Sequence, residues 1–207
     1  MYIPKYFKVD DLDAIYDVIE QHSFAKLFSQ HNGQPYATHL PFTLNRQTGV
    51  LSGHVARPNK QWTDAEEVLV VFQGPHCYIS PSWYETTKAV PTWNYVAVHV
   101  YGKLRVVTDE EAVRRSLDEL VNQYELPNST YNLADVDASF IDGLSKGIVA
   151  FDIEVTNIDA KAKLSQNHSA ERQQLVIEQL EKTTDANNRG IAKFMRDNLN
   201  KTQQHDR

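Results

Sequence analysis

The sequence predicts an α+β fold in which an antiparallel β-barrel carries peripheral helices and a helical C-terminal segment. Three strand patterns follow one another through residues 23–56 with short turns between them, which is typical of an antiparallel meander. Two further strand patterns, at 68–72 and 96–101, show no plainly solvent-facing side. Helical patterns at 108–125 and beyond 169 complete the α+β assignment.

Length and composition limit the class of protein. The 207 residues suffice for one sizeable core, and 41% hydrophobic with 23% charged residues is ordinary for a globular protein. With no membrane-length apolar run and no signal peptide, we expect a cytoplasmic protein without a membrane partner. The single cysteine, Cys77, excludes an internal disulfide, and the net charge of −6 argues against a broad nucleic-acid footprint.

The N-terminal quarter predicts a helix followed by the meander. Leucine, isoleucine and tyrosine recur at helical spacing, and either Asp10 or Asp11 can cap the start of that helix. Asn32–Gly33 between two strand patterns is a hairpin signal. The predicted ranges are a helix over Val9–His22 and strands over Ser23–Phe28, Gln34–Leu44 and Val50–Ala56.

The stretch Glu67–Val107 is predicted to be the centre of the fold. Its apolar run Val68–Phe72 favours a strand covered on both faces, followed by a loop over Gln73–Tyr84. The next strand, Val96–Tyr101, places valines on one face and aromatic or small residues on the other. We therefore expect a helix, a second subunit or a flat ligand to cover the outer face.

The second half of the chain predicts helices around one long strand. We expect a helix from Thr108 to Glu125, with Thr108 and Glu111 forming a capping box. A short helix over Ala134–Leu144 should bury Phe140, Ile141 and Leu144, and a strand should open at Gly147. Two C-terminal helices are predicted over Ser169–Glu181 and Arg189–Leu199, with a disordered tail from Lys201.

No catalytic or nucleotide-binding motif is present in the sequence. It contains no nucleophile elbow, zinc-protease, paired-cysteine or phosphate-loop signature, and the eight histidines show no metal-cluster spacing. We interpret Cys77 as a small buried hydrophobic residue rather than a nucleophile.

A polar and aromatic set of side chains gathers at the predicted strand ends and in the central loop. This mixture suits a planar, phosphorylated ligand, because cations neutralise phosphate, hydroxyl groups complete its hydrogen bonds and aromatic faces cover a ring. A polar barrel rim with tryptophans in the core explains the same residues, so the residues alone leave both interpretations open. The set is Thr38, His39, His54, Arg57, Asn59, Lys60, Tyr78, Ser80, Ser82, Trp83, Thr92 and Trp93.

Several segments carry a resemblance to a known family. They are Met1–Pro4, Tyr36–Phe42, Gly53–Trp62, Tyr78–Tyr84, Val90–Tyr95 and Lys163–Asn167. Together they strongly resemble the PaiB family of FMN-binding negative transcriptional regulators, over most of the chain up to about Glu181. That family is similar to the FMN-binding split barrels, which include pyridoxamine-phosphate oxidases and flavin reductases and hold FMN between two identical subunits.

The resemblance implies an FMN-binding split-barrel domain at 1–167 and a C-terminal helical segment and tail at 168–207. It also implies a homodimer and a set of cofactor-binding residues. One group resembles the two strands beside the flavin ring and the turn at its phosphate: Thr38, His39, Leu40, Pro41, His54, Val55, Ala56, Arg57, Asn59 and Lys60. The remaining residues would approach from the partner chain or cover the site: Tyr78, Ser80, Thr92, Trp93, Asn94, Lys163, Gln166 and Asn167.

Two function classes remain open from the sequence. The resemblance implies an FMN-binding regulator that represses transcription, although no helix-turn-helix is legible and the net charge is unfavourable for DNA. The alternative is an FMN-dependent oxidoreductase or flavin reductase, for which no residue stands out as an acid or base. A protein that binds flavin, or another flat cofactor such as heme, and does neither is the third possibility.

Overall fold

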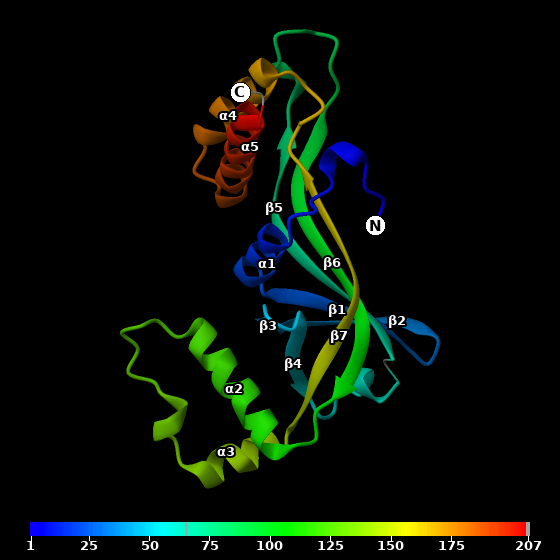
Figure 1. Cartoon of the computed structure of the whole chain (residues 1–207), viewed down its shortest axis with the longest axis vertical. Helices are drawn as coiled ribbons and strands as arrows, with labels where there is room; N and C mark the ends of the chain where they lie inside the picture. Colours follow the sequence, from blue (N-terminus) through cyan, green and yellow to red (C-terminus); the bar gives the residue numbers. More distant parts are fainter. Residues whose placement is uncertain (65, 206–207) are drawn as a thin grey trace. The chain divides into compact units, whose positions relative to one another are not determined.

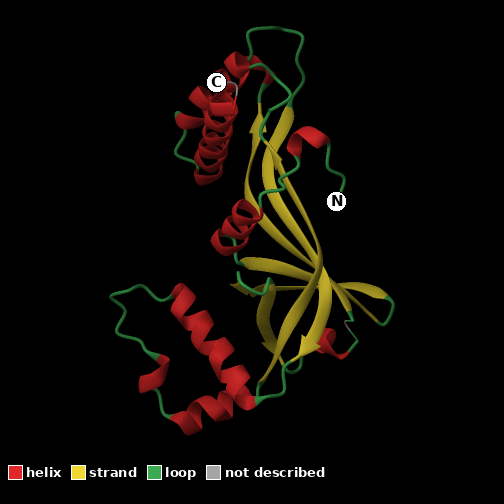
Figure 2. Ribbon diagram, viewed as in Figure 1, coloured by secondary structure: helices red, strands yellow, loops and turns green. Residues whose placement is uncertain are grey.

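The strands form the antiparallel barrel that the sequence predicts (Figure 2). The computed structural model describes residues 1–64 and 66–205. Its strands are β1 (Phe24–His31), β2 (Gln34–Pro41), β3 (Thr43–Asn45), β4 (Val50–Ala56), β5 (Glu67–Ile79), β6 (Thr92–Val106) and β7 (Ile148–Lys163). Within the described ranges these seven strands make one sheet in the order β2-β1-β5-β6-β7-β4-β3.

Five α-helices and four 3₁₀ turns accompany the strands within the described residues, and Figure 1 labels the α-helices along the chain. They are α1 (Leu12–Gln21), α2 (Glu110–Tyr124), α3 (Ala138–Ser145), α4 (Ala170–Glu181) and α5 (Ala186–His205). Single 3₁₀ turns are η1 (Lys5–Phe7), η2 (Lys60–Thr63), η3 (Pro81–Trp83) and η4 (Leu133–Asp135). Among residues 1–64 and 66–205, no helix has the length and apolar character needed to span a bilayer.

The chain divides into two compact units. The barrel unit comprises Tyr16–Phe72 and His99–Ile158, and the terminal unit comprises Met1–Ile15, Gln73–Val98 and Asp159–Arg207. All strand registers given below lie within the barrel unit. In the terminal unit, α4 and α5 pack against each other as an antiparallel pair (Figure 1).

The first hairpin forms as predicted from the Asn32–Gly33 turn. Both residues have positive φ angles, 52° for Asn32 and 74° for Gly33, which is the backbone conformation of a type I′ turn. The turn sets the register of β1 on β2, from His31 opposite Gln34 to Phe24 opposite Pro41.

The barrel closes where β4 passes the end of β2. A Cβ atom on Gly53 would lie 3.2 Å from Leu40 Cδ1 and 3.4 Å from the Pro41 carbonyl oxygen, so glycine allows this approach. Inside the barrel unit, the Phe42 ring packs edge-on against Phe72 and Phe151, at centroid distances of 5.8 and 6.3 Å. All three phenylalanines are fully buried and form the centre of the core.

Both strands of the central stretch are longer than predicted, and β6 runs over Thr92–Val106 where the sequence predicted Val96–Tyr101. Residues 73–79, predicted as loop, continue β5 to Ile79, because the strand contact outweighs the local Gly–Pro signal. A Cβ atom on Gly74 would lie 3.1 Å from Val96 Cβ, so Gly74 permits close strand packing instead of making a turn. On β6, Val96, Val98 and Val100 are buried while the alternate residues from Tyr95 to Tyr101 are half-buried.

Two details of the helices from the second half of the chain correct the predictions. Asp109, not Thr108, is the N-cap of α2, and its carboxylate accepts a hydrogen bond of 2.8 Å from the Ala112 amide. On α3, Ile141 is buried as predicted, but Phe140 and Leu144 are 59% and 57% exposed. The reason is that α3 packs through one narrow stripe.

Of the two caps that the sequence offered for the first helix, Asp11 is the one observed, and it accepts from the Asp13 and Ala14 amides at the start of α1. Ser169, for which no cap was predicted, caps α4 by accepting from the Arg172 amide. The tail predicted to be disordered from Lys201 is helical as far as His205, and its last two residues, 206–207, lie outside the described residues.

We predict that Gly102→Ala lowers the free energy of unfolding by about 1–3 kcal/mol. In the barrel unit a Cβ atom on Gly102 would lie 2.5 Å from Ile153 Cγ2 and 2.6 Å from the Glu154 carbonyl oxygen, so β6 and β7 would have to move apart. Urea denaturation measures the effect. The matched control is Gly143→Ala, whose Cβ meets nothing within 4 Å and which should be neutral or stabilising; equal losses in both variants would contradict the prediction.

Candidate functional site

The turn after β4 joins residues that are distant in sequence. The Asn59 side-chain nitrogen donates a hydrogen bond of 2.9 Å to Thr38 Oγ1 on β2, across 21 positions. The Asn59 side-chain oxygen accepts from the Gln61 amide, also at 2.9 Å, and so caps the 3₁₀ turn η2. The structure therefore brings together two residues that the sequence analysis placed in one site.

Arg57, in the same turn, is held by backbone oxygen atoms. Its Nε donates to the Lys146 carbonyl at 2.6 Å and its Nη2 to the Ile148 carbonyl at 2.7 Å. The Arg57 amide also donates to the Gly147 carbonyl at 2.8 Å. These three bonds fix the start of β7 to the end of β4, which gives Arg57 a structural task that the sequence did not reveal.

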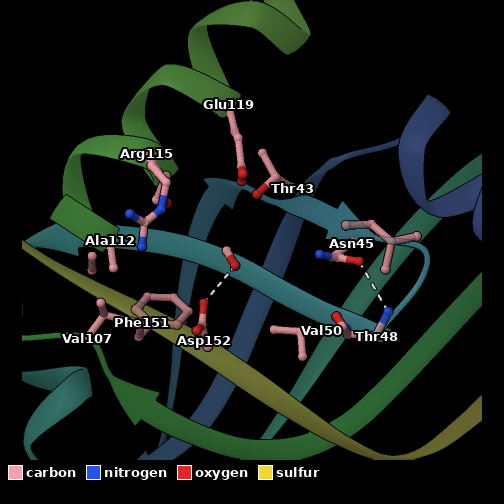
Figure 3. Close-up of a pocket in the computed structure, with 14 residues that line it drawn as sticks. Thr43, Asn45, Thr48, Val50, Val107, Ala112, Arg115, Glu119, Phe151 and Asp152 are labelled. Atoms are coloured by element: carbon pink, nitrogen blue, oxygen red, sulfur yellow. Dashed lines mark hydrogen bonds between the residues drawn. The ribbon is translucent and has the colours of Figure 1, made fainter. Parts of the chain in front are cut away.

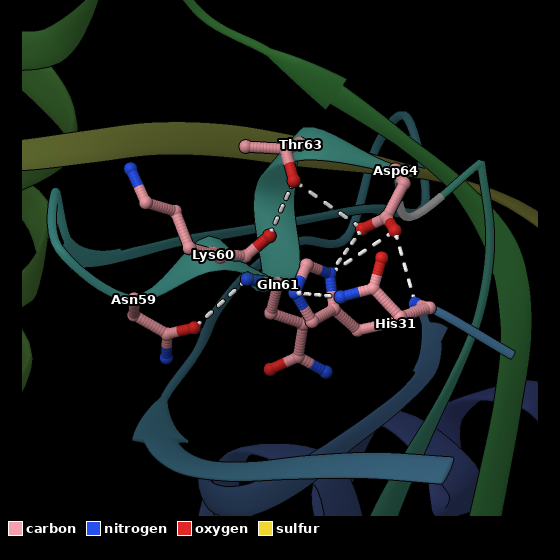
Figure 4. A network of polar contacts seen from close by, with 7 residues as sticks. His31, Asn59, Lys60, Gln61, Thr63 and Asp64 are labelled. Carbon is pink, nitrogen blue, oxygen red and sulfur yellow. Dashed lines mark hydrogen bonds and ion pairs between the residues drawn. The ribbon is translucent and has the colours of Figure 1, made fainter. Parts of the chain in front are cut away.

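Lys60 is exposed, and Figure 4 shows its ammonium group pointing away from the neighbouring polar contacts. One of these contacts is the pair of His31 and Asp64, in which His31 Nδ1 lies 2.9 Å from Asp64 Oδ1. The His31 contact lowers the pKa of the Asp64 carboxyl below its usual value. The pair fastens the tip of the first hairpin to η2, and the sequence analysis missed it because its members lie 33 positions apart.

The other candidate residues of the barrel unit line β2 and β4. Leu40 and Val55 are buried, and Val55 lies opposite Val149 on β7. His54 lies opposite Ala150, and partial burial lowers the pKa of its imidazole, which favours the neutral ring. His39 is exposed and stacks on Phe24, with ring centroids 6.4 Å apart.

In the terminal unit, three exposed or half-exposed rings cluster on neighbouring positions of β5 and β6. The Trp93 ring lies 6.2 Å from Tyr78, edge to face, and 6.3 Å from His76. Trp93 and Tyr78 are 54% and 47% exposed. Such a surface can cover the face of a flat molecule.

Lys163 lies beside this aromatic cluster. Its ammonium group donates to Thr92 Oγ1 at 2.5 Å and to the Trp93 carbonyl at 2.7 Å. Partial burial, together with the charge of Lys161, lowers the pKa of Lys163. Thr92, Trp93 and Lys163 are thus brought together, as the resemblance implied.

The remaining candidates of the terminal unit make internal hydrogen bonds. Asn94 is fully buried, and its side-chain nitrogen donates to Ser165 Oγ at 3.0 Å. The Gln166 amide closes the chain bend by accepting from the Leu164 amide and donating to the Ala162 carbonyl. The Ser80 hydroxyl caps η3, and Asn167 is exposed.

Sequence reasoning did not single out Lys161. Only 8% of this residue is exposed, and its ammonium group donates to the Tyr2 carbonyl at 3.2 Å while lying 5.1 Å from the centre of the Tyr95 ring. A cation over an aromatic face is favourable when it is partly desolvated. The alternation of Lys161 with Lys163 on one strand was the available signal, because residues two apart share a face.

Comparisons with known proteins define the class. Residues 1–157 match the family described as "Putative FMN-binding domain". The fold is similar to the flavocytochrome Anf3 from Azotobacter vinelandii, at a TM-score of 0.63 and 13% identity over 78% of this chain and 72% of that one. It is also similar to an FAD and heme binding protein from Mycobacterium smegmatis, at a TM-score of 0.60 and 16% identity over 80% and 78% of the two chains. The fold and the family match together define an FMN-binding split barrel.

Sequence relatives define the family. The chain is 41% identical to "Protease synthase and sporulation protein PAI 2" of Bacillus subtilis (strain 168), covering 97% of this chain and 99% of the relative. It is 34% identical to the uncharacterized protein YKL070W of Saccharomyces cerevisiae, over 54% of this chain and 82% of that one. The chain belongs to the PaiB family of FMN-binding proteins, and its cofactor is FMN.

The barrel unit has groups that suit FMN. A phosphate needs cations and hydrogen-bond donors, and the flavin ring needs a flat surface with polar atoms along its edge. Lys60 offers an exposed ammonium group, and Thr38 offers a hydroxyl already oriented by Asn59. Strand β2 ends the sheet order and is exposed from Gln34 to Ala37, so it has an accessible backbone edge. This donor set fits the cofactor.

We predict that Cys77 reacts slowly with thiol reagents in the folded protein. The thiol is 3% exposed, and burial, with a smaller effect of Asp185, raises its pKa to about 12. Because only the thiolate reacts, labelling by Ellman's reagent at pH 8 should be at least about 100-fold slower in native protein than in urea. Immediate reaction of one thiol equivalent in the native state would contradict this prediction.

Proposed function

We propose that this chain is a homodimeric, cytoplasmic FMN-binding regulator that represses transcription. The observation that carries the proposal is the 41% identity to the Bacillus subtilis protein, which extends over nearly the full length of both chains. That relative's name refers to protease synthase and sporulation. Within this proposal, 1–167 is the FMN-binding split-barrel domain and 168–207 is the C-terminal helical segment.

The barrel-unit residues are proposed to hold the cofactor. The exposed ammonium group of Lys60 would neutralise the phosphate. Thr38 and Asn59, which are hydrogen-bonded to each other, would lie beside the phosphate. Arg57 would act on the phosphate turn mainly by fixing it to the start of β7. The backbone from Thr38 to Pro41 and from His54 to Ala56 would run beside the flavin ring. FMN supplies the redox chemistry when it is bound.

The terminal-unit residues are proposed to approach from the partner subunit or to cover the site. The exposed Trp93 and Tyr78 offer ring faces, and Lys163 offers a partly buried cation beside them. Half-burial of the second face of β6, from Tyr95 to Tyr101, supports a subunit interface, because a face rich in aromatic residues gains stability when covered. The other residues of this group are Ser80, Thr92, Asn94, Gln166 and Asn167.

We predict that Lys60→Met weakens FMN binding by about 1–3 kcal/mol, the scale of a lost charge-assisted contact. Flavin fluorescence titration of the cofactor-free protein measures the affinity, after mass determination of the flavin released on purification. Arg57→Ala should weaken FMN binding similarly but also lower the unfolding midpoint, because it removes two hydrogen bonds, one to the Lys146 carbonyl just before β7 and one to the Ile148 carbonyl at its start.

The matched control for the cofactor experiment is Lys103→Met, an equally exposed lysine on β6. It should leave FMN affinity and stability unchanged. If Lys60→Met binds FMN as tightly as this control, the phosphate is held elsewhere on the chain.

Contact with DNA would have to be local, since the chain carries a net charge of −6. Helix α5 offers a short basic face. Two of its arginines are engaged within the terminal unit, Arg189 with the Thr183 carbonyl and Arg196 with Glu181. Lys193 and Lys201 are exposed and remain suited to phosphate contacts.

We predict that the FMN-loaded dimer binds labelled promoter DNA selected from genomic fragments, with a Kd of about 1 μM or tighter at physiological salt. Lys193→Gln with Lys201→Gln should weaken binding and flatten the salt dependence by about four units of slope, because each subunit of the dimer loses two phosphate contacts. Lys88→Gln is the control, and sedimentation checks the dimer.

The same preparation separates a regulator from a flavin reductase. The FMN-loaded protein should consume NADH or NADPH no faster than free FMN does under the same conditions. Sustained turnover of either nicotinamide, together with no DNA complex at micromolar protein, would contradict the proposed repression and favour an oxidoreductase.

A further inference from the structure

A pocket lies in the barrel unit, apart from the residues proposed to hold FMN. It opens between helix α2 and strands β3, β4 and β7, with a cavity volume of about 450 Å³. This volume is within the range of small-molecule sites. None of the eighteen candidate cofactor residues lines it.

The pocket exists because of the residues on one face of α2. Ala112, Arg115, Ser116 and Glu119 recur at helical spacing and line the pocket. Figure 3 shows the side chains of Arg115 and Glu119 directed toward the sheet. The two small residues leave space against the strands, and the two charged residues reach over it. The buried Phe151 and Ala150 form the apolar floor.

Polar groups from four elements converge on this space (Figure 3). On the sheet side, Ser52 of β4 donates a hydrogen bond of 2.6 Å to Asp152 Oδ1 on β7, which orients that carboxylate. Thr43 of β3 lies across from the Glu119 carboxylate of α2 in the figure. Sites with an apolar floor and a few oriented polar groups typically bind small molecules.

The charged groups select the ligand class. Arg115 is the cation of the pocket, and Glu119 and Asp152 are its carboxylates. The two carboxylates would repel a simple anion, and the guanidinium group would repel a simple cation. A molecule that carries both charges satisfies all three groups at once.

Arg115 can change partners at low cost. Its ion pair with Glu111 spans 3.8 Å between highly exposed side chains, 65% and 89%, and such surface pairs contribute little. Arg115 and Glu119 are separated by one helical turn, about 6 Å of rise, so they can bracket one small ligand.

We propose that this pocket binds a free α-amino acid, with its carboxylate on Arg115 and its ammonium group on Asp152 and Glu119. Asn45 and Thr48 also line the pocket, and the side chain of the amino acid would lie toward them. The site gives the protein a small-molecule input that is independent of the FMN residues, and it does not rest on the proposed repression of transcription.

The experiment uses the full-length, FMN-loaded protein and the twenty standard L-amino acids, each tested by saturation-transfer NMR and then by calorimetry. At least one should bind with a Kd of about 1 mM or tighter. Its N-acetyl and its carboxamide derivatives should each bind at least about tenfold more weakly, because each loses one charged contact.

Variants then place the ligand in the pocket. Arg115→Gln and Asp152→Asn should each weaken binding at least about tenfold, while FMN content stays unchanged. Matched controls on α2 are Arg114→Gln and Asp118→Asn, whose side chains do not line the pocket and which should bind normally. The proposal is overturned if no amino acid binds, if N-acetylation is tolerated, or if the pocket variants bind like the controls.

Discussion

The barrel unit depends on the contact at Gly53, where β4 passes so close to the end of β2 that a side chain would meet Leu40 and the Pro41 carbonyl. This approach brings β2, at one end of the sheet order, against β4, the last strand but one at the other end, and places Phe151 and Leu40 on the same core. It also brings the exposed part of β2 beside the turn that follows β4. The hydrogen bond from Asn59 to Thr38 can form only because of that closure.

The turn after β4 serves two purposes at once. Arg57 holds the start of β7 through two carbonyl oxygens, while Lys60, three residues later, is directed outward. A rigid turn reduces the entropy lost when an anion is bound, because the cation is already positioned. The stability of the barrel and the proposed phosphate contact of Lys60 therefore depend on the same short segment.

Local signals made much of the fold predictable. The Asn32–Gly33 turn needs positive φ angles that these residues favour, and Val50–Ala56 is a strand bounded by turns on both sides. Residues 73–79 were wrongly predicted as a loop because Gly and Pro normally end a strand. Here Gly74 instead accommodates Val96 from a neighbouring strand. That neighbour is a tertiary effect that no local pattern contains.

The membership of the candidate site stays a prediction, whereas contacts among its residues are seen in the structure. The family motifs pointed to Thr38 and Asn59, which the structure joins. They could not show that Arg57 binds backbone carbonyls about ninety positions away, or that Asn94 is fully buried beside Ser165. Pairings of this kind arise from strand register and depth, which a single sequence specifies only through the whole fold.

The placement of Cys77 has a practical consequence for studying the molecule in solution. The chain contains no other cysteine, and Cys77 is buried in β5. We therefore expect that site-directed labelling needs no prior removal of a native cysteine. A cysteine introduced on an exposed lysine position would be the single place where a maleimide dye or nitroxide attaches. Two such positions, one in each compact unit, would let fluorescence transfer or spin-echo spectroscopy follow how the units orient during ligand exchange.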